Sequence, residues 1–198
     1  MKKQFIHQTA LVETESIGEG TSIWAFAHVM KHARIGSNCN VGDHCFIESG
    51  AEIGNNVTIK NGCMIWEGIT VEDGVFIGPN VLFTNDRYPR SPRLPEAEKR
   101  YSTKNWLLPT RIKRGVSIGA GAVLMPGITI GKYATVAAGA VVVKDVPAFG
   151  LVVGNPARQR GWVCKCGQVL TFKNKIGECQ NCKSTFKMEN NLTVQLIG

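Results

Sequence analysis

The sequence predicts an all-β fold, a parallel β-helix assembled from six-residue repeats. Three observations lead to this fold class. An apolar residue recurs at every sixth position, a second small or apolar residue follows four positions after most of these, and glycine often comes directly after the first. The first series consists of Phe5, Leu11, Ile17, Ile23, Val29, Ile35, Val41, Ile47, Ile53, Ile59, Ile65, Val71, Ile77 and Phe83.

Each six-residue repeat is expected to supply one short strand and one corner. Residues two apart lie on the same face of a strand, so the residue at the fourth position and the next member of the first series both point inward. Gly, Asn and Asp between the strands permit the left-handed backbone that a tight corner needs. Three repeats then make a triangular coil, and stacked coils bury a common core that no single coil could bury alone.

The repeat is interrupted once, after Phe83. Residues 1–16 form an incomplete first coil, and the pattern is regular from Ile17 onward. Residues 84–111 contain four prolines and many charges, and Ile112 comes 29 positions after Phe83, which is not a multiple of six. This segment is therefore expected to leave the β-helix as a long loop, and long loops in compact domains are usually functional. The series resumes with Ile112, Ile118, Leu124, Ile130, Val136 and Val142.

The expected organisation has one main domain and a C-terminal appendage. We assign residues 1–148 to the β-helix, 149–163 to a connector, 164–188 to a ribbon-like segment and 189–198 to a tail. No apolar run is long enough to span a membrane, and no apolar segment of a signal peptide follows the first residues. The sequence therefore predicts a cytoplasmic protein with no membrane partner.

Four of the seven cysteines form two close pairs near the C-terminus, Cys164-x-Cys166 and Cys179-x-x-Cys182, with twelve residues between the pairs. Such pairs are typical of a four-thiolate zinc site, although the first pair is one residue tighter than usual. Because all four ligands would be cysteine, the zinc would be structural; free or redox-active thiols are the alternative. The other three cysteines lie on the inward series and are expected to be small core residues: Cys39, Cys45 and Cys63.

Positive charge is concentrated in two segments of the chain, whose net charge is +8. Residues 87–114 hold nine basic and two acidic side chains, and residues 157–188 hold seven basic and one acidic. A positive field on a loop and a tail suits an anionic ligand such as a nucleotide, although a solvated rim would have the same composition. Aromatic residues are too sparse there for base stacking, so no nucleic-acid partner is expected.

Several motifs resemble one family of enzymes. These motifs are Ile23-Trp24, Glu67-Gly68, the loop start 83–91, the segments 115–122 and 139–147, and Val153-Gly154-Asn155-Pro156-Ala157-Arg158 with Gly161-Trp162. Together they resemble the hexapeptide acyltransferases with a left-handed parallel β-helix, and among these the N-acetyltransferases of nucleotide-linked 3-amino sugars. The greatest similarity is to the UDP-2-acetamido-3-amino-2,3-dideoxy-glucuronate N-acetyltransferases of surface-polysaccharide (lipopolysaccharide O-antigen) pathways. The run from Asn85 to Arg90 is also similar to enzymes acting on dTDP-3-amino-3,6-dideoxyhexoses, so this acceptor is the first alternative.

The resemblance implies a homotrimer that binds acetyl-CoA between subunits and acetylates a sugar amine. It assigns Asn85 to contact the acceptor amine, with Glu67 one coil earlier holding or orienting it. The residues expected to bind CoA are Ala120, Ala138, Lys144 and Arg158. Those expected to bind the sugar nucleotide are Asp86, Arg87, Arg90 and His28.

The chemistry does not require a histidine base. A neutral amine is already a nucleophile, so a thioester reaction needs mainly proximity and a donor for the developing oxyanion. All four histidines precede the loop. Two other functions are weighed: a zinc-dependent carbonic anhydrase of the same fold, which requires three converging histidines, and a non-catalytic trimeric scaffold that holds a partner through its tail.

Overall fold

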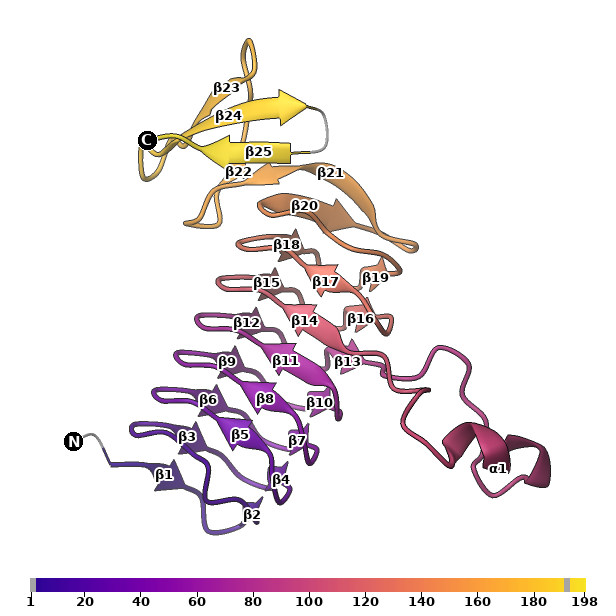
Figure 1. Cartoon of the computed structure of the whole chain (residues 1–198). Helices are drawn as coiled ribbons and strands as arrows, with labels where there is room; N and C mark the ends of the chain where they lie inside the picture. Colours follow the sequence, from indigo (N-terminus) through magenta and orange to yellow (C-terminus); the bar gives the residue numbers. More distant parts are fainter. Residues whose placement is uncertain (1–2, 191–192) are drawn as a thin grey trace.

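The structure is a computed structural model that describes residues 3–190 and 193–198. It confirms the predicted left-handed parallel β-helix, with short strands winding in stacked coils and the C-terminal segment placed over one end (Figure 1). Residues 1–2, in the expected first coil, and residues 191–192, in the expected tail, lie outside the described residues.

The coils form a prism with three flanks, one for each parallel sheet. Flank A consists of β1 (Phe5–Ile6), β3 (Ser22–Ile23), β6 (Asn40–Val41), β9 (Thr58–Ile59), β12 (Phe76–Ile77), β15 (Ser117–Ile118) and β18 (Thr135–Val136). Flank B consists of β2 (Leu11–Val12), β4 (His28–Val29), β7 (Phe46–Ile47), β10 (Met64–Ile65), β13 (Leu82–Phe83), β16 (Val123–Leu124) and β19 (Val141–Val142). Flank C consists of β5 (Arg34–Ile35), β8 (Glu52–Ile53), β11 (Ile69–Val71), β14 (Thr110–Ile112) and β17 (Thr129–Ile130).

From Ile23 onward, the core consists of the two inward series that the sequence pattern identified. The prediction is wrong for Phe5 and Leu11, which are 44% and 55% exposed, because Ile6 and Val12 are the residues in register with the buried Ile23 and Val29. Ile23, Val81 and Ile118 are examples that expose none of their surface. The three cysteines expected in the core are buried there, and burial raises the pKa of the Cys39 thiol. Thr21 is a polar exception, and its hydroxyl donates to the carbonyl of Gly36 at 2.7 Å, so its burial leaves no unsatisfied donor.

The insertion leaves at a single corner, between β13 on flank B and β14 on flank C. In Figure 1 it projects sideways from the β-helix and carries a helix, α1 (Pro95–Tyr101). Pro95 starts the helix, and its acidic residues lie in the first turn and its basic residues in the last, as the helix dipole favours. The helix buries only Ala97 and is too short for its own apolar pattern to predict it.

The C-terminal segment extends flank A and then adds a separate sheet. β20 (Gly150–Val153) pairs with β18, and β21 (Arg158–Val163) and β22 (Val169–Leu170) follow antiparallel. β23 (Ile176–Glu178), β24 (Thr185–Asn190) and β25 (Thr193–Leu196) form a three-stranded sheet. Because β25 pairs with β24, much of the expected tail 189–198 belongs to the ribbon. Across the described ranges, no helix has the length and hydrophobicity of a membrane span.

Candidate functional site

Asn85 lies where the chain leaves the β-helix, two residues after the buried Phe83. Its side-chain Nδ2 donates to the carbonyl of Glu67 at 3.3 Å, and its own carbonyl accepts from the amide of Leu108 at 2.9 Å. Asn85 therefore joins three segments: the start of the loop, the end of the loop and the coil below. As the repeat predicted, Glu67 lies one coil before Asn85, at the equivalent position of that coil.

The Glu67 carboxylate faces the loop, and 29% of its side chain is exposed. It accepts a hydrogen bond from the ammonium group of Lys104, a loop residue that the sequence analysis did not single out. The Glu67 amide in turn donates to the carboxylate of Glu48 at 2.7 Å. The Glu67 carboxylate thus binds a primary ammonium group that belongs to the protein itself.

The Asp86 carboxylate is occupied by the loop itself. Its Oδ1 accepts from the Tyr88 amide at 2.9 Å and from Arg100, and its Oδ2 accepts from the Tyr101 hydroxyl at 2.7 Å. The Tyr101 oxygen also accepts from the Arg90 amide at 2.9 Å. Burial raises the pKa of Asp86, but these hydrogen bonds together outweigh burial, and the pKa is lowered. Asp86 thus contacts protein groups, whereas the sequence analysis expected it to contact the substrate.

Two arginines assigned to the sugar nucleotide lie on the exposed side of the loop. Arg87 donates from Nη2 to the carbonyl of Pro126 at 3.2 Å, which ties the loop to the next coil. Arg90 donates from Nη1 to the carbonyl of Pro89 at 2.8 Å. These contacts leave both guanidinium groups solvent-facing, with donors for an anionic ligand.

His28 lies far from Asn85 within one chain. It is in register with Phe46, Met64 and Leu82, so three strand spacings, roughly 14 Å, separate it from the strand that leads to Asn85. The His28 ring contacts Glu13 at 2.6 Å, and this hydrogen bond is the main cause of the lowered pKa of Glu13. A single chain does not bring His28 to the mouth of the loop.

Lys144 lies at the same corner as Asn85. Asn85 comes three residues after Leu82 in β13, and Lys144 comes three residues after Val141 in β19. On flank B, β13 and β19 are two strand spacings, roughly 10 Å, apart. Lys144 also lines a cavity of about 530 Å³ at the end of the core, together with Val142, Ala157 and Gln159. Arg158 begins β21 beside this cavity and donates from Nη1 to the carbonyl of Ala157 at 3.1 Å.

Ala120 and Ala138 stack on each other at a different corner, between flanks A and B. The amide of Gly139 donates to the Ala120 carbonyl at 2.8 Å, so the two alanines occupy equivalent places in successive coils. Gly119 allows the close stacking, because a Cβ there would come within 2.3 Å of the Ala138 nitrogen. Both alanines are exposed, and their small side chains leave the backbone accessible along this corner.

The geometry agrees with comparisons to known proteins. The pattern described as "Bacterial transferase hexapeptide (six repeats)" matches residues 16–49, 50–85 and 109–144. A dTDP-3-amino-3,6-dideoxy-alpha-D-galactopyranose 3-N-acetyltransferase from Aneurinibacillus thermoaerophilus is 49% identical over 193 residues, covering 98% of this chain and 95% of the relative. The chain belongs to the hexapeptide-repeat sugar N-acetyltransferase family.

Other similarities are shorter or more distant. A putative acetyltransferase from Schizosaccharomyces pombe is 39% identical over 82 residues, 41% of this chain and 37% of that protein. The acetyltransferase domain of PglB from Neisseria gonorrhoeae, solved with acetyl coenzyme A, has a TM-score of 0.52 at 23% identity. That match covers 79% of this chain and 57% of the PglB chain, so it supports the fold alone.

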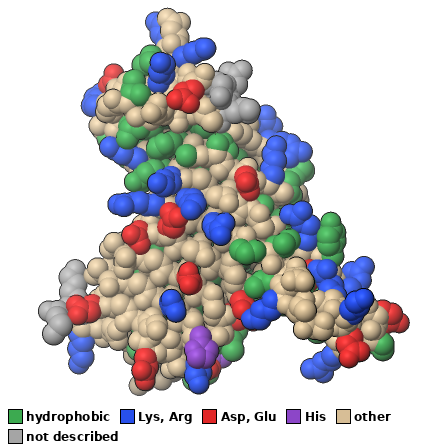
Figure 2. Space-filling view, viewed as in Figure 1, with side chains coloured by type: hydrophobic (Ala, Val, Ile, Leu, Met, Phe, Trp, Pro, Cys, Tyr) green, Lys and Arg blue, Asp and Glu red, His purple; other side chains and the backbone are tan. Residues whose placement is uncertain are grey.

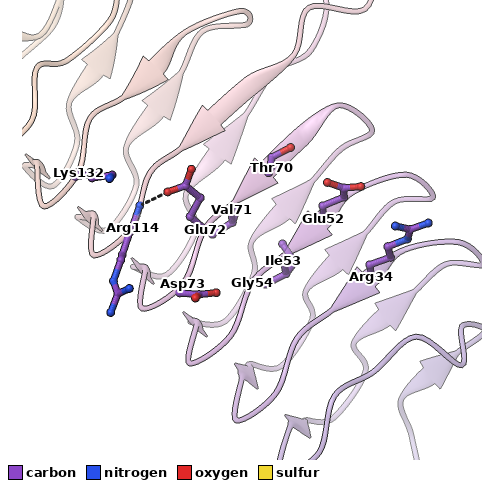
Figure 3. Close-up of a pocket in the computed structure, with 10 residues that line it drawn as sticks. All are labelled: Arg34, Glu52, Ile53, Gly54, Thr70, Val71, Glu72, Asp73, Arg114 and Lys132. Atoms are coloured by element: carbon purple, nitrogen blue, oxygen red, sulfur yellow. Dashed lines mark hydrogen bonds between the residues drawn. The ribbon is translucent and has the colours of Figure 1, made fainter.

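A second groove of this acetyltransferase, of about 530 Å³, lies on flank C and contains none of the predicted site residues (Figure 3). Its charged side chains have mixed signs. The Glu72 carboxylate already accepts from Lys113 at 2.8 Å and from the Arg114 amide at 2.9 Å. Because its charges neutralise one another locally, this groove is a poorer candidate site than the mouth of the loop.

The four C-terminal cysteines of the acetyltransferase come together. Their sulfur atoms all lie within 4.8 Å of one another, with 3.3 Å between Cys164 and Cys182 and 3.5 Å between Cys166 and Cys179. Cys164 and Cys179 are buried, whereas Cys166 and Cys182 are exposed. The donor set and the spacing fit a tetrahedral zinc ion.

Proposed function

We propose that the protein acetylates the 3-amino group of a nucleotide-linked 3-amino sugar, with acetyl-CoA as the donor. The observation that carries this proposal is the 49% identity to a dTDP-3-amino-dideoxygalactose 3-N-acetyltransferase, which extends over 98% of the chain and includes the loop. The mouth of the loop supports it, because the Asn85 side chain donates there to the backbone carbonyl of Glu67, whose carboxylate faces the loop residue Lys104.

The acceptor has better support as a dTDP-3-amino-3,6-dideoxyhexose than as the UDP-linked glucuronate that the sequence analysis put first. The Aneurinibacillus thermoaerophilus relative is named for a dTDP-linked sugar, and the alignment with this chain covers 95% of that relative. Acetylated nucleotide sugars are activated building blocks for polysaccharides, so we place the reaction in surface-polysaccharide synthesis, in the cytoplasm where acetyl-CoA is available.

The proposed reaction is a direct attack. The neutral amine nitrogen attacks the thioester carbonyl carbon, the C–N bond forms, and the C–S bond of the tetrahedral intermediate breaks. The proton lost from nitrogen ends on the sulfur of CoA, so an amide and a free thiol are the products. Positioning supplies much of the rate, because a well-oriented pair of reactants avoids most of the entropic cost of meeting.

Asn85 and Glu67 would hold the amine for this attack. The Asn85 Nδ2 donates to the Glu67 carbonyl, and its amide oxygen would accept a hydrogen of the amine. The Glu67 carboxylate, which accepts from Lys104, would accept a hydrogen bond from the neutral acceptor amine in place of Lys104. We propose that Arg87 and Arg90 bind the diphosphate, and that Asp86 and His28 act on the sugar nucleotide only indirectly or from a neighbouring subunit.

Acetyl-CoA would lie along the β-helix between two subunits, with its phosphates near Lys144 and Arg158. Because Ala120 and Ala138 lie at a different corner of the prism, they would contact the pantetheine arm from the neighbouring subunit. We propose a homotrimer, because flank B exposes apolar side chains that a neighbouring subunit can cover. Leu11 in β2 is 55% exposed, Leu82 in β13 47%, and Val143, which directly follows β19, 42%. Light scattering should give three times the 21.6 kDa mass of one chain, and a fully active monomer would contradict a shared donor site.

The test is turnover of acetyl-CoA with a panel of acceptors, followed by mass spectrometry of the product. The panel contains dTDP-3-amino-3,6-dideoxygalactose, UDP-2-acetamido-3-amino-2,3-dideoxy-glucuronate and a dTDP-sugar with a 3-hydroxyl in place of the amine. We expect N-acetylation with the highest kcat/KM for the dTDP-amino sugar and none for the hydroxyl control. A preference for the UDP-sugar would restore the glucuronate assignment, and no product from any amine would favour the scaffold alternative.

A further inference from the structure

The strongest feature that the proposed reaction leaves unused is the cysteine cluster at the C-terminal end. The two close sulfur pairs each join one cysteine of the first motif to one of the second, so the cluster connects two segments of chain. The sulfur–sulfur distances of 3.3 and 3.5 Å are far longer than a disulfide bond of about 2.05 Å. In a tetrahedral zinc site with bonds of about 2.3 Å, the sulfurs lie about 3.8 Å apart, within the spread seen here.

Each cysteine pair lies in a tight turn closed by backbone hydrogen bonds. The Cys164 amide donates to Gln168, and the Gly167 amide donates back to the Cys164 carbonyl, both at 2.8 Å. In the second turn, the Cys179 amide donates to Ser184 and the Lys183 amide donates back to Cys179, both at 2.9 Å. The second turn is one residue longer, which accounts for the C-x-C and C-x-x-C spacings of the two motifs.

The segment that contains these turns, residues 164–198, has only a small apolar core besides its three-stranded sheet. Units with a core this small usually need a metal, a disulfide or a partner for stability. Among the described residues, its buried apolar cluster consists of Trp162, Leu170, Phe186 and Val194 together with two of the cysteines. Two of the six buried residues of this core are thus thiols of the four-cysteine cluster.

The same cluster is continuous with the last coil of the β-helix. Phe149 stacks on Tyr133 with ring centroids 5.5 Å apart and contacts Phe186 edge-on at 5.2 Å. The Val163 amide, one residue before Cys164, donates to the Phe149 carbonyl at 2.8 Å. In Figure 1 the segment sits over the C-terminal end of the prism, where the edge of flank A would otherwise be open.

We propose that Cys164, Cys166, Cys179 and Cys182 bind one Zn²⁺ ion per chain, and that this ion locks the C-terminal cap over the end of the β-helix. The cap is defined here as residues 162–198. Zinc joins the turn after β21 to the turn before β24, so it fixes both hairpins of the cap at once. The ion has no open coordination position and takes no part in the acetyl transfer.

The first experiment is metal analysis of the full-length protein purified under reducing conditions without chelators or metal-affinity steps. We expect about one zinc per chain. The double variant Cys166→Ser/Cys182→Ser changes the two exposed ligands and should bind none, whereas Gln180→Ala, in the same turn but exposed and not a ligand, should keep its zinc. Iron in place of zinc, or no metal in the reduced protein, would overturn the assignment.

The second experiment uses the metal alone as a probe of geometry and of the cap. Co²⁺ added to the zinc-free full-length protein should give the visible spectrum of a tetrahedral four-thiolate site, and Zn²⁺ should displace it. Hydrogen exchange should then show that zinc removal loosens residues 162–198 while the amides of β3 to β17 keep their protection. Equal protection of the cap with and without zinc would contradict its role as a lock, whatever the metal content.

Discussion

The β-helix and the loop 84–111 are stabilised in different ways. In the β-helix each six-residue repeat from Ile23 onward buries the same two apolar positions, as Val81 and Leu124 illustrate, and each strand repeats the pairing of the one below. The loop buries one side chain of its helix, Ala97, and is held by polar contacts centred on Asp86. The regular part supplies a rigid frame, and the irregular part places the chemical groups.

The largest difference between the two regions should appear when one leucine is truncated in each. Leu124 is fully buried in the β-helix, so Leu124→Ala should lower the free energy of unfolding by about 2–5 kcal/mol. Leu94, in the loop, is 48% exposed, so Leu94→Ala should cost less than about 1 kcal/mol. Chemical denaturation of the two variants measures both values. Similar costs would mean that the loop packs as tightly as the core.

This contrast explains what could be predicted from the sequence. A fixed six-residue spacing determines which residues are buried, so the coils, the place of the interruption and the phase shared by Glu67 and Asn85 were all predictable. Nothing periodic connects Asp86 to Tyr101, 15 residues later, or Glu67 to Lys104. These contacts form only when the loop folds back on itself, so neither Lys104 nor the loop contacts of Asp86 could be predicted from the sequence, and the role of Asp86 toward the substrate stays a prediction.

A smaller effect is expected from changing one carboxylate in each region. Asp86→Asn removes the charge that Arg100 and Tyr101 contact, and should destabilise the closed loop by about 1–3 kcal/mol. Asp73→Asn is the matched control in the β-helix, where an exposed oxygen accepts from the Asn55 amide at 2.7 Å and an amide oxygen can do the same. Hydrogen exchange of residues 84–111 measures the loop. Unchanged exchange in Asp86→Asn would show that other contacts hold it.

The smallest effect is expected from pH. The pKa of Asp86 is lower in the folded loop than in the unfolded chain, where it is about 4. The ionised carboxylate therefore stabilises the loop fully above about pH 4, and this stabilisation is lost as the pH falls through the pKa of the folded state. Trp106 contacts Tyr101 edge-on at 5.5 Å and reports on the loop. The fluorescence of Trp106, obtained by subtracting the signal of Trp106→Phe from that of the unchanged protein, should change below about pH 4. In Asp86→Asn this change should be absent, and its persistence would assign it to another group.

The most direct test of the account is the steady-state turnover of Asn85→Ala and His28→Ala, side by side, at saturating acetyl-CoA. If Asn85 positions the amine, Asn85→Ala should raise the barrier by roughly 2–4 kcal/mol with the fold intact, since the residue follows the last buried position of its coil. His28 lies three strands away in the same chain, and a neutral amine needs no base, so His28→Ala should lower turnover by less than about tenfold. An inactive His28→Ala beside a nearly normal Asn85→Ala would contradict the account and establish a histidine-based mechanism.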